Sequence, residues 1–226
     1  MSDKRAIVIG ASRGIGLGLV RELAERGYAV IATERSRSEE LHALAAESSV
    51  EVATCDVTDT GSVASLNSRC GNGSVDLLIL NAGIYGDRPQ ELDSLARDNV
   101  ADILMTNAVG PVQAALALLP LLKDGGAIGM MSSKMGSIDD SSGGSNLYRL
   151  SKVAQNMLAR SLFEQRAGPH GVGVISLHPG WVQTDMGGPN APIDVDTSVT
   201  GMLDLLEAES EPRHAFLAYD GTPVPW

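Results

Sequence analysis

The sequence predicts a single-domain α/β fold: a doubly wound, mostly parallel seven-stranded sheet with helices on both faces. Short apolar runs alternate regularly with longer helical stretches along the 226 residues. Several of these runs, such as Ala6–Ile9 and Leu77–Leu80, are apolar at every position, as expected of strands that helices cover on both sides. The first run ends in a glycine-rich turn that leads directly into a helix, which is typical of the start of such a sheet.

The apolar runs predict strands at 5–9, 28–33, 50–54, 75–80, 126–131, 172–177 and 214–219. The stretches between them predict helices at 14–26, 38–47, 60–70, 96–121, 147–166 and 195–208. Sheets of this kind bind ligands outside the carboxyl ends of their strands, near the point where the strand order reverses. We therefore look for chemistry in the segments that follow each predicted strand.

Composition and charge exclude several function classes. The formal net charge of −11 argues against nucleic-acid binding and against docking on anionic membranes. The apolar stretch near the N-terminus is too short for a signal peptide or a spanning helix. Cys55 and Cys70, the two cysteines, cannot make a disulfide scaffold or a metal cluster. We expect a cytoplasmic protein that binds no metal.

The turn after the first strand is suited to phosphate. Its glycines permit a tight turn and a close approach of backbone to pyrophosphate, and the exposed N–H groups at the helix start attract negative charge. Its glycine spacing, G-x-x-x-G-x-G, differs from the commoner G-x-G-x-x-G pattern. The alternative is a plain tight turn between strand and helix. The candidate binding residues here are Gly10, Ser12, Arg13, Gly14, Ile15 and Gly16.

Tyr148 and Lys152 form the candidate acid–base pair. Four residues apart on a predicted helix, they lie on one face, about 40° apart around the axis. A free phenol has a pKa of about 10, and a nearby ammonium lowers it towards the range useful for proton transfer. By itself the pair is weak evidence, because a tyrosine and a lysine at this spacing usually just share a solvated helix edge.

The motifs, in their order along the chain, resemble the short-chain dehydrogenase/reductase family in its compact, Rossmann-like division. The segments 178–188 and 219–226 are similar more narrowly to its sniffer/C-factor-like carbonyl reductase branch. The resemblance covers nearly the whole chain. It rests on the Gly10–Gly16 turn, Asp56, Asn81-Ala82-Gly83, Asn107, Ser132-Ser133, Tyr148 with Lys152, and Pro179-Gly180.

The resemblance implies catalytic roles for four residues. Tyr148 would give or take the proton, and Ser133 would hold the substrate oxygen; Ser132 and a merely structural serine are the alternatives. Lys152 would lower the pKa of the phenol and reach the nicotinamide ribose. Asn107 would interrupt its helix and complete a proton relay, unless it is simply a tolerated mid-helix asparagine.

The resemblance also implies the rest of a dinucleotide site. Asp56 would accept from the adenine amino group, although a helix cap is the alternative role for this carboxylate. His178, Arg149 and Ser151 are expected to be structural, surface or packing positions. The other cofactor-binding candidates, besides Tyr148 and Lys152 themselves, are Val57, Asn81, Ala82, Gly83, Pro179, Gly180, Val182 and Thr184.

Cofactor choice rests on opposing charges. Glu34 lies 34 − 16 = 18 residues after Gly16, the place of the carboxylate that binds the ribose 2′-hydroxyl of NAD. Arg13 and Arg35, with help from Arg37, would instead bind the 2′-phosphate of NADP. We expect a preference for NADP, with NAD as the alternative.

Together these features predict an NAD(P)-dependent oxidoreductase that moves a hydride between nicotinamide and a carbonyl or secondary alcohol carbon. A non-catalytic dinucleotide-binding sensor or partner protein on the same fold is the main alternative; an epimerase or dehydratase is a further one.

The short segment 186–193 is expected to form a small substrate loop. Helix 96–121 carries apolar residues on more faces than one core needs, which favours a homodimer or tetramer. These apolar residues of the helix are Leu104, Ala108, Val112, Ala115, Leu116 and Leu119.

Overall fold

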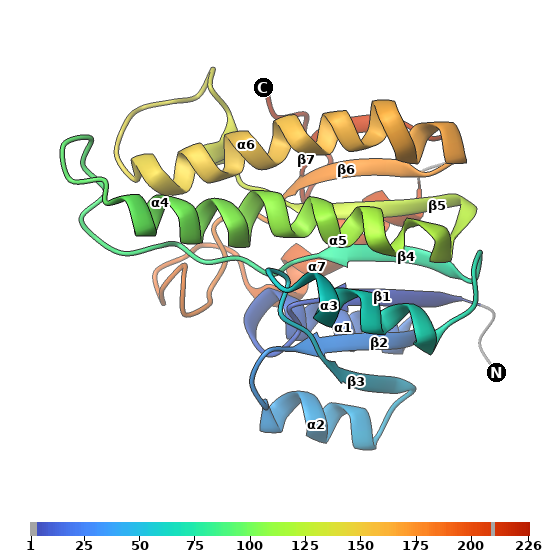
Figure 1. Cartoon of the computed structure of the whole chain (residues 1–226). Coiled ribbons are helices and arrows are strands. Elements are labelled where there is room, and N and C mark those ends of the chain that lie inside the picture. Colours follow the sequence, from blue (N-terminus) through green and yellow to red (C-terminus); the bar gives the residue numbers. More distant parts are fainter. Residues whose placement is uncertain (1–3, 209–210) are drawn as a thin grey trace.

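The computed structural model describes residues 4–208 and 211–226, and these fold as one α/β unit around a seven-stranded sheet (Figure 1). The strand order is β3-β2-β1-β4-β5-β6-β7, and every neighbouring pair is parallel. The prediction of a doubly wound sheet is thus confirmed. The strands are β1 Arg5–Ile9, β2 Ala29–Glu34, β3 Val50–Thr54, β4 Val75–Leu80, β5 Leu122–Met131, β6 Gly173–His178 and β7 His214–Ala218.

Helices cover both faces of the sheet and bury two apolar clusters. One cluster joins the sheet to α3, α5 and α6, and the other joins it to α1, α2 and α7. Figure 1 shows α5 and α6 side by side across the first of these faces. The helices are α1 Gly14–Glu25, α2 Glu39–Ala46, α3 Thr60–Ala64, α4 Arg97–Leu104, α5 Gly110–Leu118, α6 Asn146–Leu162 and α7 Val195–Glu207.

The reversal of strand order falls between β1 and β4. The chain winds outward through β2 and β3 on one side of β1 and through β5, β6 and β7 on the other. Ile9 pairs with Leu80, so the two strands end at the same level. Both strands are buried along almost their whole length, which explains their unbroken apolar sequence. The segments beginning at Gly10 and Asn81 therefore flank the crevice where such sheets bind ligands.

The predicted helix 96–121 is interrupted. It consists of α4, a π-helical turn at Met105–Val109, α5 and a 3-10 turn at Leu119–Leu121. The single continuous helix was therefore wrong in detail, because a side-chain contact of Asn107 described below widens the middle turn. The run Arg97–Leu121 is apolar and long enough to cross a membrane, but 56% of its most apolar window is buried inside the fold. It is the core helix of this α/β unit.

Other differences lie at element ends. Helix 60–70 turns 3-10 from Ser65, and helix 147–166 turns π-helical from Phe163. Strand β5 begins at Leu122, earlier than predicted, because Leu122 still pairs with Val75 across an irregular register. Helix ends commonly change their hydrogen-bond pattern in this way, and their sequences carry no signal for it.

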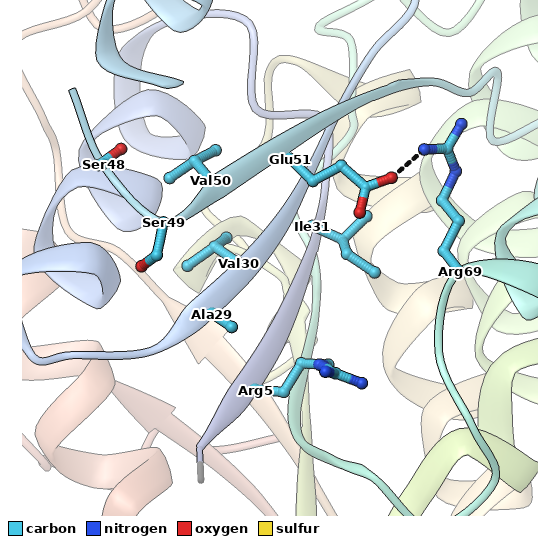
Figure 2. Close-up of a pocket in the computed structure, with 9 residues that line it drawn as sticks. All are labelled: Arg5, Ala29, Val30, Ile31, Ser48, Ser49, Val50, Glu51 and Arg69. Carbon is cyan, nitrogen blue, oxygen red and sulfur yellow. Dashed lines mark hydrogen bonds and ion pairs between the residues drawn. The ribbon is translucent and has the colours of Figure 1, made fainter. Parts of the chain in front are cut away.

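A hollow opens at the amino ends of β1, β2 and β3. Figure 2 shows that its lining comes from the first residues of β1, β2 and β3, with Glu51 and Arg69 forming an ion pair at its rim. It lies at the amino ends of these strands, whereas the glycine turn follows the carboxyl end of β1. Since ligands of parallel α/β sheets bind at the carboxyl ends of the strands, this hollow is not the candidate site.

Packing of the central strands should dominate stability. Leu78, in β4, is fully buried, whereas Leu92 is 78% exposed on the segment after that strand. We expect Leu78→Ala to lower the free energy of unfolding by about 2–5 kcal/mol, because it leaves a cavity in the core. Leu92→Ala, the matched control, should change it by less than about 0.5 kcal/mol. Urea denaturation measures both, and equal effects would contradict this account of the core.

Candidate active site

The turn between β1 and α1 leaves its backbone open to a ligand. A Cβ atom on Gly16 would lie 2.1 Å from the Gly10 carbonyl oxygen, and one on Gly10 would lie 2.7 Å from Ala82. The side-chain amide of Asn81 donates to the Gly10 carbonyl at 2.7 Å and fixes the turn against β4. No side chain caps the start of α1 at Arg13. The first N–H groups of the helix are therefore suited to an anion, and the predicted residues from Ser12 to Gly16 surround them.

Glu34 ends β2 but does not face outward. The residue is 6% exposed, and its carboxylate accepts hydrogen bonds from the Ser38 backbone N–H at 2.7 Å and from the His42 ring at 2.8 Å. Arg37 forms an ion pair with Glu39. The predicted help of Arg37 in binding phosphate is thus not seen in the structure, because a nearer carboxylate engages its guanidinium.

The other two arginines lie exposed on either side of the glycine turn. Arg13 forms an ion pair of 2.9 Å with Asp185, across the crevice. Arg35 lies close enough to Asp56 to act on its titration: hydrogen bonds from Thr58 lower the pKa of Asp56, and the charge of Arg35 adds to that shift. Arg35 is therefore available beside the end of β2, whereas a phosphate would have to displace Asp185 from Arg13.

Asp56 follows β3 and forms a local turn. Its Oδ1 accepts from the backbone and hydroxyl of Thr58 at 2.9 and 2.7 Å, while Asp59 caps α3. Asp56 therefore does not cap that helix. Val57 is buried in the core beside it. The segment Asn81–Gly83 follows β4, which pairs with β1 rather than with β3.

Asn107 links the π-helical turn to the segment after β4. Its Oδ1 accepts from the Ile84 backbone N–H at 2.8 Å, and its Nδ2 donates to the Ile84 carbonyl at 2.7 Å and to Ser151 Oγ at 3.0 Å. A fully buried amide needs such partners. Ser151, expected to be a surface or packing residue pointing elsewhere, is fully buried and also donates to the Tyr148 carbonyl.

The two serines after β5 have different environments. Ser132 is buried, and its hydroxyl donates to Asn156 at 2.7 Å. Ser133 is partly exposed, caps a short 3-10 turn by accepting from the Met135 N–H, and hydrogen-bonds the Tyr148 hydroxyl. Only Ser133 therefore has its hydroxyl beside the phenol.

The Tyr148 ring stacks against Tyr85, with 5.1 Å between ring centroids. The Tyr85 hydroxyl is bonded to Ser145, and the Arg88 guanidinium lies over the Tyr85 ring, 4.9 Å from its centroid. Burial raises the pKa of Tyr148 to about 12, against the hydrogen bond with Ser133 that lowers it. The expectation of a lowered phenol pKa is therefore wrong for the protein alone, because burial outweighs every favourable contact.

Lys152 is 3% exposed and lies beneath this ring. Its ammonium is 5.8 Å from the Tyr148 ring centroid and donates to the Met131 carbonyl at 2.7 Å and to Gln155 Oε1 at 3.1 Å. Burial lowers the pKa of Lys152 to about 7, and no charged side chain offsets it. A Cβ on Gly83 would lie 3.7 Å from the ammonium, so this glycine keeps the space above the lysine open.

The segment after β6 closes the crevice. Val182 pairs with Ile193, which folds residues 186–193 into a compact loop, and the Trp181 indole donates to the Gly187 carbonyl. Thr184 lies against Gly14, since a Cβ on that glycine would be 3.3 Å from its methyl group. Pro179 is bound through its carbonyl to Ser198, and Gly180 has a φ of +85°.

His178 is the last residue of β6. Burial lowers its pKa to about 4, so the ring is neutral near pH 7. Its assignment as a structural residue remains a prediction.

Sequence reasoning missed the residues that hold the site together. Four of them meet partners at least 24 residues away, so no local pattern announces them. Ser38, His42 and Gln155 lie within eight residues of theirs, and for these the available signal was a polar residue inside a predicted helix. The missed residues are Ser38 and His42 on Glu34, Asp185 on Arg13, Tyr85 and Gln90 beside Tyr148, Gln155 on Lys152, and Asn156 on Ser132. In residues 4–208 and 211–226, no group of three or more histidine, cysteine or carboxylate side chains could hold a metal ion.

Known proteins resemble this chain in sequence and in structure over most of its length. Residues 4–192 match the family model for short chain dehydrogenases. The C-signal protein of Myxococcus xanthus is 41% identical over 162 residues, covering 68% of this chain and 94% of that protein. A carbonyl reductase from Pseudomonas aeruginosa PAO1, solved in complex with NADP, superimposes with a TM-score of 0.91 at 35% identity over 100% of both chains. The carbonyl reductase Sniffer of D. melanogaster gives a TM-score of 0.85 at 32% identity, again over 100% of both chains.

The buried lysine makes stability depend on pH. The pKa of Lys152 falls from 10.5 to about 7 on folding, so the unfolded chain binds one more proton between these values. The cost of burial is complete below pH 7 and disappears as the pH rises to 10.5. We expect the unfolding free energy of the wild type to rise between pH 7 and pH 10 relative to that of Lys152→Met. Parallel denaturation curves at the two pH values measure this, and equal pH slopes would refute it.

Proposed function

This chain belongs to the short-chain dehydrogenase family and is an NAD(P)-dependent oxidoreductase, and we propose that it reduces small carbonyl compounds with NADP as cofactor. The observation that carries the proposal is the convergence of Ser133, Tyr148, Lys152 and Asn107 at the carboxyl ends of β4 and β5. The reverse reaction, oxidation of a secondary alcohol, uses the same groups.

A dinucleotide fits the residues of this crevice. Gly10, Gly14 and Gly16 form a cradle that a single added Cβ would fill, and the uncapped start of α1 offers its N–H groups to the pyrophosphate. Asp56 keeps one carboxylate oxygen for the adenine, and Thr184 stands opposite the turn. Val57, Ala82, Val182 and Pro179 shape the walls between them. When bound, the reduced nicotinamide supplies the hydride.

The protein supplies the proton and the orientation. We assign Tyr148 as the general acid, because its raised pKa keeps the phenol protonated near neutral pH. The Ser133 hydroxyl, bonded to the phenol, holds the substrate oxygen at the same place. Lys152 lies under the ring and beside Gly83, where its ammonium can donate to ribose hydroxyls and stabilise the phenolate that proton transfer leaves.

Asn107 and Ser151 support the backbone around Tyr148 and Lys152. Asn107 fixes the backbone at Ile84 and is bonded to Ser151, which in turn bonds the Tyr148 carbonyl. We assign Asn107 the role of positioning the segment after β4 over Lys152. Its amide also lies in the path by which a proton would return to the lysine.

The preference for NADP follows from charge. Arg35 is exposed at the end of β2, and no carboxylate among residues 4–208 and 211–226 forms an ion pair with it, while the Glu34 carboxylate is bonded to Ser38 and His42. Three related carbonyl reductase or dehydrogenase structures are described with NADP or NADPH bound. Both observations support NADP over NAD.

We propose that two segments control substrate access. One carries Tyr85, which stacks on the Tyr148 ring, and the other is the short loop 186–193, closed by the pairing of Val182 with Ile193. Carbonyl reductases among the relatives support a small aldehyde or ketone as substrate. We place the protein in the cytoplasm, with no nucleic-acid or membrane partner, on the strength of its charge of −11.

A homodimer, or a tetramer, is proposed through α5 and α6. The sequence predicted apolar residues on the helical run 96–121 beyond those that the core needs. Four of these residues are instead buried in the core of the chain itself: Ala108, Val112, Ala115 and Leu119. The face that remains apolar consists of Leu116, Met105, Leu150 and Met157, each 38–58% exposed on α6 or on the helical run that packs against it.

Removing the phenol oxygen tests the chemistry. Tyr148→Phe should fold and bind NADPH within a few-fold of the wild type, but lose at least about 10²-fold in turnover of a generic diketone or aldehyde. Steady-state kinetics and a fluorescence titration measure the two. Near-normal turnover would remove Tyr148 from the mechanism, whereas loss of NADPH binding would show misfolding of the site.

Arg35 tests the cofactor assignment. Arg35→Ala should weaken NADPH binding by about 10-fold or more and leave NADH binding almost unchanged, since only NADPH carries the phosphate it would contact. Arg166→Ala, an exposed arginine after α6, is the matched control. A wild type that prefers NADH, together with unaltered NADPH affinity in Arg35→Ala, would make NAD the cofactor and Glu34 its ribose ligand.

The apolar face of α5 and α6 tests assembly. Light scattering at micromolar concentration should give at least twice the chain mass of 23.6 kDa. Leu116→Asp should shift the protein towards the monomer, because a charge in an apolar interface is costly. Leu92→Asp, at an exposed leucine on the segment between β4 and α4, should leave the mass unchanged. A wild-type monomer would overturn the proposal.

A further inference from the structure

The Glu34 carboxylate is held against the start of α2 by two hydrogen bonds. Its Oε2 accepts from the Ser38 backbone N–H at 2.7 Å, and its Oε1 lies 2.8 Å from His42 Nε2. The side chain is 7% exposed, and that of His42 is 32% exposed. A carboxylate buried to this degree is costly unless donors satisfy it, so these two bonds determine where it points.

The His42 ring is oriented from its other side. Arg37 Nη1 lies 3.3 Å from both ring nitrogens and pairs through Nε with Glu39 at 2.8 Å. Since a carboxylate only accepts, we assign a hydrogen to His42 Nε2, which donates it to Glu34. Arg37 lies equally near both ring nitrogens, so it helps to position the ring without selecting one nitrogen over the other.

This cluster touches the phosphate turn. The Ser38 hydroxyl donates to the Ser12 carbonyl at 2.6 Å and also caps α2 by accepting from the Leu41 N–H. The ribose at the adenine end of a dinucleotide lies at this strand end. A carboxylate free to turn towards it would accept from the 2′-hydroxyl of NAD and repel the 2′-phosphate of NADP.

We propose that His42 is a specificity-determining residue, which retains the Glu34 carboxylate on α2 and thereby favours NADP over NAD. The inference rests on the proposed function, because it concerns the cofactor of the same site. His42 acts on the cofactor through Glu34, while Arg35 remains free to meet the phosphate. Selectivity here comes from restraining a carboxylate as well as from offering a cation.

The test is the ratio of NADPH to NADH dissociation constants, measured by titrating nucleotide fluorescence on each purified full-length variant. His42→Leu removes the donor, so NADPH should weaken and NADH should tighten, changing the ratio by about 10-fold. His42→Gln keeps an N–H donor of similar reach and should restore most of the wild-type ratio. His170→Leu, a histidine before β6 at the other edge of the sheet, should leave the ratio unchanged. The fraction of folded protein cancels in such a ratio.

A Glu34→Ala background separates this role from a structural one. There His42→Leu should leave the ratio unchanged, because no carboxylate remains to be released. An equal change with and without Glu34, or no change in the wild-type background, overturns the proposal. If the wild type binds neither nucleotide, the proposed function itself fails, and that outcome is distinct from a wild type that binds NADPH but ignores His42.

Discussion

The close approach of two backbone turns at the carboxyl ends of β1 and β4 is the constraint on which the site depends. A side chain at Gly10 or Gly16 would overlap Ala82 or the Gly10 carbonyl, and the Asn81 amide bonds that carbonyl directly. The glycines therefore let the first turn of α1 come close to the sheet with its N–H groups uncovered. The proposed pyrophosphate site follows from that contact, because the dipole and the N–H groups act only over the first turn.

A second set of bonds carries this geometry from β4 to the phenol. Asn107 holds Ile84 at both its N–H and its carbonyl, so the next residue, Tyr85, is delivered against Tyr148. Gln90 then accepts from the Tyr148 N–H and donates to the Tyr85 carbonyl. The segment after β4 is thus fixed at both ends. The π-helical turn at Met105–Val109 belongs to the same arrangement, because its wider turn brings the Asn107 amide to the backbone of Ile84.

The fold could be predicted from sequence because its signals are local: Ala6–Ile9 and Leu77–Leu80 are apolar throughout, and the glycine turn follows at once. The side-chain arrangement could not. Asn107 finds its partner 23 residues away at Ile84, and the direction of Glu34 depends on a helix turn that only the folded chain brings back to β2. The direction of the Tyr148 pKa was missed for a similar reason. Spacing announces the nearby lysine, but burial is a property of the whole surrounding fold.

Burial of both members of the Tyr148–Lys152 pair has opposite effects that together favour one protonation state. It raises the pKa of the phenol to about 12 and lowers that of the ammonium to about 7, so the neutral phenol is strongly populated at pH 7 while the lysine lies near its midpoint. A protonated phenol is the form that gives a proton to a carbonyl oxygen. Oxidation of an alcohol needs the phenolate instead, which burial makes scarce. Within the proposed mechanism, the protein alone is therefore poised for reduction, and the positive charge of an oxidised nicotinamide would lower the phenol pKa for the reverse step.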